Sequence, residues 1–199
     1  MFKSVLCAAL SISALSAFAQ TADTATQPQS VSTVFSQQVF YTIPKQFNSQ
    51  LQFEQNNGNS YINERALNGE TVESWTQLIT VTGEIDLAKN PNISPWAIIG
   101  TLVQGFQTAC PSSFSGLKMF DAQINGHPAA AAVLSCGMLN NQSETALIIA
   151  IRGVNDYYTV QWAEHGKASS KPLKLDEEKW LARFNALELG LHTATSPNR

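Results

Sequence analysis

The chain has 199 residues, a formal net charge of −3 and only 14% charged residues, so its polarity comes mainly from Gln, Asn, Ser and Thr. It contains no run of like charges and no cluster of Lys and Arg with interleaved aromatic residues, a feature of proteins that follow a phosphate backbone. The composition therefore argues against nucleic acid or an anionic membrane surface as a partner.

Residues 1–19 predict a cleaved secretory signal peptide. Lys3 precedes an apolar run, Val5–Leu15, and the small residues of Ala17–Ala19 form a cleavage site. A retained membrane anchor is one alternative, but the run is well short of the roughly 20 residues that a spanning helix needs. A lipoprotein is another, but Cys7 stands too early to be the acylated first residue of a mature chain. We expect a periplasmic or secreted protein.

Removal of the signal leaves two cysteines, Cys110 and Cys136. An even count in an oxidising compartment favours a disulfide between them, with two separately buried thiols as the alternative. On the chain-entropy model such a bridge stabilises the fold by about 3.5 kcal/mol. A catalytic cysteine is disfavoured, because an exported nucleophile would need a reduced thiol and a nearby histidine base.

The first half of the mature chain predicts a leader and then strands. Residues 20–36 are rich in Thr, Gln and Ser without any period, which indicates a flexible leader. Apolar residues then alternate in short runs separated by turn residues such as Pro44, 55–59 and 68–70. The predicted strands are residues 39–43, 51–53, 61–67 and 75–81.

A helix is expected from Pro95 to Ala109. Ser94 is a good N-cap, Pro95 suits the first helical position, and Pro111 ends the helix. Apolar residues recur at helical spacing and end at Cys110. Gly100 and Gly105 each cost about 1 kcal/mol relative to Ala, so packing must hold this helix.

Two hairpins and a last helix complete the chain. Asn125-Gly126 joins strands 117–124 and 128–138, and residues 153–155 join strands 145–152 and 156–164. On these patterns Cys110 and Cys136 both face apolar surfaces, so a bridge would fasten the helix to the sheet. The last helix begins with the acidic turn Asp176, Glu177 and Glu178, continues with the stripe Trp180, Phe184, Leu187 and Leu191, and ends at Gly190 as a C-terminal cap.

We therefore expect one domain over residues 37–191, followed by a frayed tail over 192–199. The order of elements predicts an α+β fold: an antiparallel sheet of about six to eight strands with two main helices packed on it. The layout, with the stretches Phe40–Pro44 and Val72–Val81, resembles small exported bacterial proteins of the PsbP/Mog1-like group over residues 39–189. That resemblance implies a binding or assembly factor without catalysis, and no functional residue is transferred from it.

Motifs for catalysis or metal binding are missing from the sequence. There is no G-x-S-x-G elbow, phosphate-binding glycine loop or H-E-x-x-H motif, and no histidine has a second metal ligand at helical spacing. Paired carboxylates could do acid-base work only if the fold placed one in an apolar cleft; solvated charges are the simpler interpretation. The residues considered are His127, His165 and His192, the carboxylate pairs Glu84 with Asp86 and Glu70 with Glu73, and Arg65 beside Glu64, which fits an ion pair as well as an anion clamp.

The strand 156–164 has two faces. We expect Tyr158, Val160 and Trp162 to face the core under the helices, which would leave Tyr157, Thr159 and Gln161 on a solvent-facing sheet that could bind a protein or glycan. We accordingly expect an exported non-catalytic binding, inhibitory or assembly protein with no metal and no cofactor, whose partner is another envelope or secreted protein. The alternative is an envelope hydrolase whose acid and base come from separate strands, with a buried carboxylate next to His127 or His165.

Overall fold

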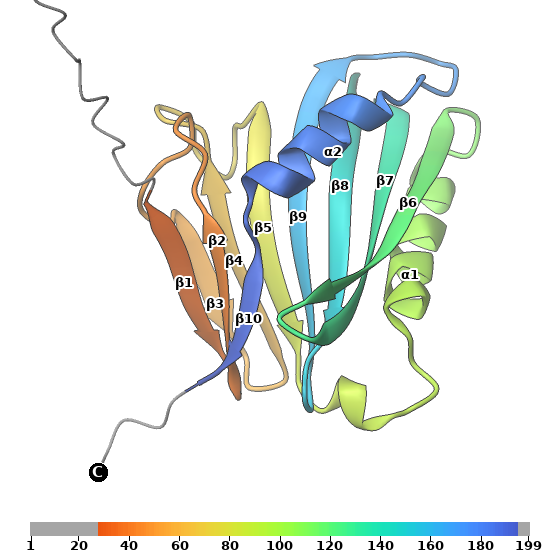
Figure 1. Ribbon diagram of the computed structural model, residues 1–199. Helices are drawn as coiled ribbons and strands as arrows, with labels where there is room; N and C mark the ends of the chain where they lie inside the picture. The colour runs from red at the N-terminus through yellow and green to blue at the C-terminus, as the bar shows by residue number, and fades with distance from the viewer. Residues whose placement is uncertain (1–27, 195–199) are drawn as a thin grey trace, which may run out of the picture.

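The computed structural model describes residues 28–194. The predicted signal peptide, the first part of the leader and the end of the tail lie outside the described residues. Within this range the fold is α+β, with a seven-stranded sheet, a three-stranded sheet and two α-helices (Figure 1).

The large sheet is antiparallel throughout and has the order β3-β4-β5-β9-β8-β7-β6. Both predicted hairpins are present in it, and Asn125 and Gly126 have the positive φ values that a tight two-residue turn requires. The strands are β3 (Phe53–Asn56), β4 (Ser60–Ala66), β5 (Gln77–Glu84), β6 (Phe114–Ile124), β7 (His127–Leu139), β8 (Gln142–Arg152) and β9 (Tyr157–Lys167).

The small sheet joins the two ends of the described chain, because β2 (Gln37–Thr42) pairs with both β1 (Gln29–Val34) and β10 (Gly190–Thr193). The expectation of a flexible leader is thus wrong for residues 29–34, and that of a frayed tail is wrong for residues 192–193. Ser30, Ser32 and Val34 of β1 face inward. Because two of these three buried positions are serine, the sequence lacks the apolar alternation that predicts a strand.

Helix α1 (Pro95–Ala109) covers part of one face of the large sheet, and the short 3-10 helix η1 (Leu87–Lys89) precedes it. As predicted, Ser94 caps α1 by accepting a hydrogen bond from Ala97 N, and Pro95 is its first residue. The helix lies over β7 and β8, whose small side chains on this face let it approach closely. Ile99 of the helix is buried there with sheet residues of β7 and β8, which are Ala130, Ala132, Leu134, Ala146, Ile148 and Ala150.

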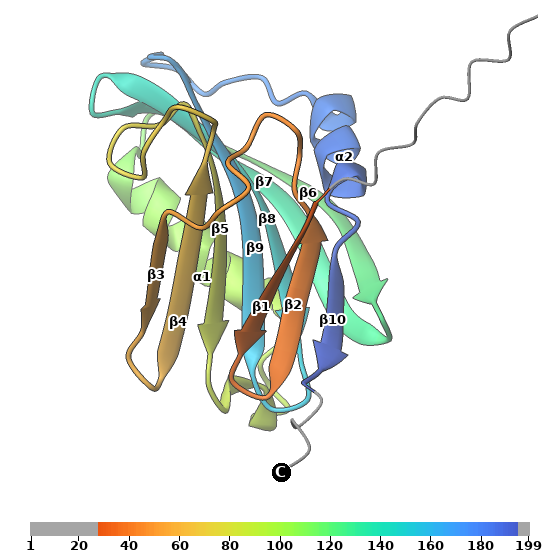
Figure 2. The same ribbon diagram turned by 90° about the vertical axis from the view of Figure 1, so that its left-hand side faces the viewer.

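The opposite face of the large sheet carries the main core, covered by the small sheet and by α2 (Glu177–Ala186) (Figures 1 and 2). Helix α2 ends earlier than the stripe predicted: Leu187 is its C-cap, and Gly190 begins β10 instead of capping the helix. Glu188, with a φ of 42°, turns the chain between them. Leu191 is therefore buried in the same core from a strand and not from the helix.

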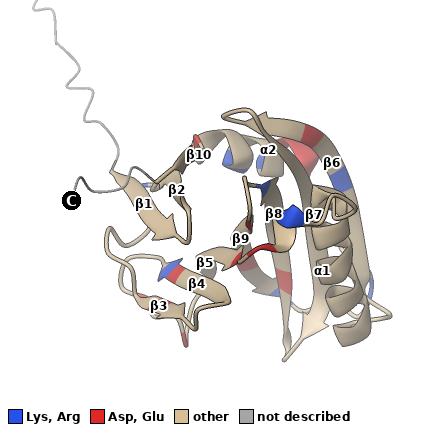
Figure 3. Ribbon diagram, turned by 90° about the horizontal axis from the view of Figure 1, so that it is seen from below, with Lys and Arg blue, Asp and Glu red and all other residues tan. Residues whose placement is uncertain are grey.

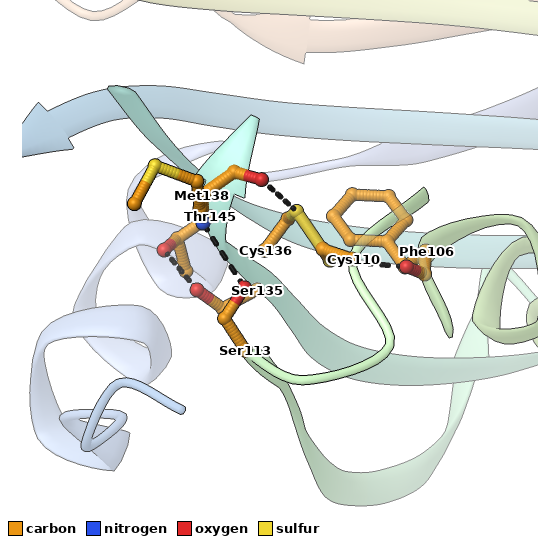
Figure 4. The surroundings of a disulfide bond; sticks show 7 residues. All are labelled: Phe106, Cys110, Ser113, Ser135, Cys136, Met138 and Thr145. Atoms are coloured by element: carbon orange, nitrogen blue, oxygen red, sulfur yellow. Dashed lines mark hydrogen bonds between the residues drawn. A yellow bond between two sulfur atoms is a disulfide. The ribbon is translucent and has the colours of Figure 1, made fainter. Parts of the chain in front are cut away.

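The disulfide between Cys110 and Cys136 links the end of α1 to β7, as the sequence predicts (Figure 4). The two Cα atoms are 5.7 Å apart, and both side chains are buried. Ser113 follows α1 closely, and its hydroxyl accepts a hydrogen bond from Met138 N at 3.1 Å. Helix α1 is thus held to the sheet by a covalent bond and by the chain that follows it, which fixes one wall of the groove described next.

Candidate binding groove

The half of the large sheet beside α1 forms the floor of a groove with a volume of about 500 Å³. Helix α1 contacts β6, β7 and β8, and β3, β4, β5 and β9 continue past it on the same face. Pairing aligns the floor residues across the sheet, because Ile62 lies opposite Thr82 and Thr82 lies opposite Thr159. A row of side chains therefore runs across three neighbouring strands.

The walls of the groove differ from its floor. Helix α1 and the short helix η1 supply mainly apolar side chains to the walls. Leu87 comes from η1, and Ile98 and Leu102 come from α1, which also contributes Thr101. Strand β3 and its turn supply amides at the outer rim. The groove is lined by Gln55, Asn57, Ser60, Tyr61, Ile62, Thr82, Glu84, Leu87, Ile98, Thr101, Leu102, Thr159 and Gln161.

Hydroxyl and amide groups dominate the polar chemistry of the floor. The hydroxyls of Thr82 and Thr159 are 2.7 Å apart, and Gln161 Nε2 donates to Thr159 Oγ1 at 3.3 Å. Thr159 is only 7% exposed, whereas Thr82 and Gln161 are half-buried. The floor thus offers neutral hydrogen-bonding groups that the fold holds in place.

The groove carries little charge. Glu84 is the one charged residue among those that line it, and it accepts a hydrogen bond from Ser60 Oγ at 2.7 Å. Helix α1 contains no charged residue, as Figure 3 shows by its uniform colour. On the same face of the sheet, burial raises the pKa of Glu64, and the hydrogen bond from Thr80 opposes this rise only in part. These surroundings favour an uncharged ligand.

The structure corrects the expected arrangement of the β9 faces. Tyr158, Val160 and Trp162 do face the main core, but α1 lies on the opposite face from α2. Tyr157 is consequently buried, with its hydroxyl donating to Ile93 O, and is not on a solvent-facing sheet. Of the three residues expected on that surface, only Thr159 and Gln161 line the groove.

The three histidines lie in separate places outside the groove. His165 stacks on Trp75, with ring centroids 3.6 Å apart, and its Nδ1 is 2.9 Å from Trp75 O. Its Nε2 is 3.4 Å from Glu144 Oε2. His127 Nε2 lies 3.3 Å from a side-chain amide of β2, and His192 stacks on a β2 phenylalanine.

The carboxylate pairs from the sequence are not placed in an apolar cleft. Glu84 lines the groove, whereas Asp86 is exposed and forms an ion pair of 2.6 Å with Lys89. Burial alone would raise the pKa of Glu70, but hydrogen bonds from the Thr76 hydroxyl and backbone outweigh it and lower the pKa. Its partner Glu73 is exposed. The solvated interpretation of these carboxylates is therefore the better one.

Arg65 forms neither an ion pair with Glu64 nor an anion clamp, the two interpretations that the sequence allowed. It is buried between the sheets, where Nε donates to Tyr41 Oη at 3.1 Å and Nη2 donates to Ser30 Oγ at 3.2 Å. Nη1 donates to Asn48 O. Glu64, the preceding residue of β4, points to the opposite face, so neither the ion pair nor the anion clamp forms.

Two polar clusters were missed in the sequence. Arg183 of α2 lies 4.8 Å from the ring centre of Trp162 and 4.4 Å from that of Trp180, and its Nη2 donates to Glu164 Oε2 at 2.7 Å. Buried Asp156 accepts hydrogen bonds from Ser36, Asp86 N and Tyr158. Burial, with help from Asp156, raises the pKa of Tyr158. No motif marks either cluster, since its members come from distant parts of the chain.

Within residues 28–194, no group of three His, Cys, Asp or Glu side chains is arranged to hold a metal ion. In the same range no helix has the length and apolar character to cross a membrane. No known protein-family model matches the chain, and comparison with curated proteins finds no match. The resemblance to the PsbP/Mog1-like group thus stays a prediction.

Proposed function

We propose that the protein is an exported, non-catalytic binding protein, with an inhibitory or assembly role, and that the groove beside α1 is its binding site. Its partner is another envelope or secreted protein. The chemistry of the groove is the observation that carries this proposal. Its lining consists of hydroxyls, amides and apolar side chains with the single carboxylate Glu84, and contains no His, Cys, Lys or Arg. Such a lining can recognise a ligand. Its one hydroxyl–carboxylate contact, from Ser60 Oγ to Glu84 Oε2, is exposed to solvent, and no His, Cys or Lys of the lining accompanies it.

Export, to the periplasm or the medium, rests on two features of the chain. Residues 1–19 have the pattern of a signal peptide, and the bond between Cys110 and Cys136 is of a kind that persists in oxidising compartments. The resemblance to the PsbP/Mog1-like group supports the same proposal, because it implies binding or assembly rather than catalysis.

Thr101 allows a direct test of the groove. It is exposed on α1 and lines the groove, whereas Gln104 is exposed on the same helix outside it. Arginine is a good helix former, so Thr101→Arg places a long charged side chain in the groove at little cost to the helix. We expect Thr101→Arg to lose the partner that the wild-type protein retains from periplasmic extract, at least tenfold, and the control Gln104→Arg to retain it.

The pulldown contradicts the proposal if no protein is retained reproducibly above an unrelated exported bait. It also contradicts the proposal if the Thr101→Arg protein retains as much partner as the Gln104→Arg protein, because binding would then lie elsewhere. Circular dichroism of both variants checks that the helix is intact.

The alternative function, an envelope hydrolase, is favoured by one observation, the contact between His165 and Glu144. However, Trp75 covers the ring of His165, and both ring nitrogens already face protein oxygens. This alternative would be favoured if the wild-type protein hydrolysed an envelope substrate and Glu144→Gln abolished that activity.

A further inference from the structure

We propose that the ligand of the groove is an extended polypeptide segment, which pairs with β3 as an additional strand and places alternate side chains over the groove. This inference rests on the proposed function and adds the mode of binding. Strand β3 forms one edge of the large sheet, and all four of its residues are exposed. Gln55 of β3 and Asn57, which follows the strand, both line the groove, so the edge and the groove form one continuous surface.

The edge of β3 offers main-chain groups to a ligand. Asn57 N donates to Ser60 O at 3.1 Å, so the N–H groups of the odd-numbered residues along β3 point towards β4. Because successive N–H groups of a strand point to opposite sides, those of Glu54 and Asn56 point away from the sheet. Unpaired N–H and C=O groups along an edge recognise a polypeptide backbone, which is how added strands bind in other proteins.

The two edges of the large sheet differ. At the other edge, the pairing of β6 shifts between Lys118 and Phe120, and the strand carries Lys118 and Asp121. Bulges and edge charges of this kind are the usual protection against the addition of a further strand. Strand β3 is short and carries Glu54, but it pairs with β4 without a shift and contains neither lysine nor proline, and Glu54 lies on the side away from the groove. The edge without a bulge is thus the one that borders the groove.

Pairing also determines which side chains of the ligand meet the groove. Gln55 lies opposite Ile62 on the groove side, whereas Glu54 lies opposite Asn63 on the other side. A strand added about 4.8 Å beyond β3 would follow the same alternation, so every second side chain would face the groove. Because Glu84 alone among the lining residues is charged, the side chains in those positions would be polar and uncharged or apolar.

Glu54→Pro tests this mode of binding. Proline removes the outward N–H of residue 54 but no main-chain hydrogen bond between β3 and β4, and proline is tolerated on sheet edges. The hydrogen bond that Tyr61 Oη donates to Glu54 Oε1 is lost in any variant without this carboxylate. Glu54→Ala is the matched control, because it loses the same carboxylate and keeps the N–H. The probe is a twelve-residue peptide enriched on the wild-type protein from a random peptide library displayed on phage. We expect Glu54→Pro to weaken its binding, measured by fluorescence anisotropy, at least tenfold relative to Glu54→Ala.

A second measurement on the wild-type protein does not depend on the folding of a variant. Bound peptide should slow hydrogen exchange of the Glu54 and Asn56 amides at least tenfold and leave the amides of β6 unchanged. Equal binding by the two Glu54 variants, unchanged exchange at Glu54 and Asn56, or a failure to enrich any peptide would overturn the inference. If Thr101→Arg still abolishes retention of the partner protein in that case, the groove binds it in another way and the proposed function stands; if it does not, both fail.

Discussion

Arg65 carries a positive charge in a layer from which water is almost excluded. Its side chain is 2% exposed, and its three hydrogen-bond acceptors, Tyr41, Asn48 and Ser30, are all neutral. These acceptors lie on β1, on β2 and in the loop before β3, so one guanidinium ties the small sheet to β4. The sequence left an ion pair with Glu64 and an anion clamp open as alternatives, and neither forms. Adjacent residues of a strand point to opposite faces, and the sequence does not show that Arg65 takes the core-facing side of β4.

Arg65→Ala should lower the free energy of unfolding by about 3 kcal/mol, because buried acceptors that lose a donor cost about 1–3 kcal/mol, and side-chain packing is lost as well. Urea denaturation followed by tryptophan fluorescence measures this change. Lys45→Ala, at an exposed position before β3, is the control and should stay within about 0.5 kcal/mol of wild type. A similar small change in Arg65→Ala would show that the guanidinium is not a structural link.

Elements with a strong local signal are the ones that sequence could predict. Helix α1 is marked by its cap and its proline, and the turn at Asn125-Gly126 marks a hairpin that the structure contains. Strands β1 and β10 could not be predicted, because each is stabilised by pairing with β2, a contact between the two ends of the described chain. The early end of α2 follows from the same long-range pairing.

Strand β7 shows how closely one element approaches another. A Cβ atom on Gly137 would lie 2.6 Å from Ser169 O and 2.8 Å from Lys171 O, both backbone atoms of the segment before α2. Gly137→Ala should therefore destabilise the fold by about 1–3 kcal/mol, as overpacking does. The matched control is Gly105→Ala on α1, where a Cβ meets no atom within 4 Å and where alanine gains up to about 1 kcal/mol of helix propensity. In urea denaturation we expect the free energy of unfolding to fall for Gly137→Ala and to rise for Gly105→Ala. An unchanged free energy of unfolding in Gly137→Ala would contradict the close approach.

At the scale of the whole molecule, two layers cover opposite faces of one sheet and leave part of one face open. The sequence predicted the α+β class, the disulfide and the alternation of Thr159 and Gln161. It could not predict the groove, because the lining residues come from β3 and the turn after it, from β4, β5, η1, α1 and β9, and share no motif. Nor could it show that the two helices cover opposite faces, since periodicity shows that a helix has an apolar side but not which face of a sheet that side meets.

Crosslinking in living cells tests whether the groove binds another exported protein. A benzophenone amino acid replaces Thr101 in one strain and Gln104 in another, so the two probes sit on the same helix inside and outside the groove. We expect irradiation to give one discrete adduct with an exported protein from position 101 and none from position 104. No adduct from position 101, or equal adducts from both positions, would contradict it.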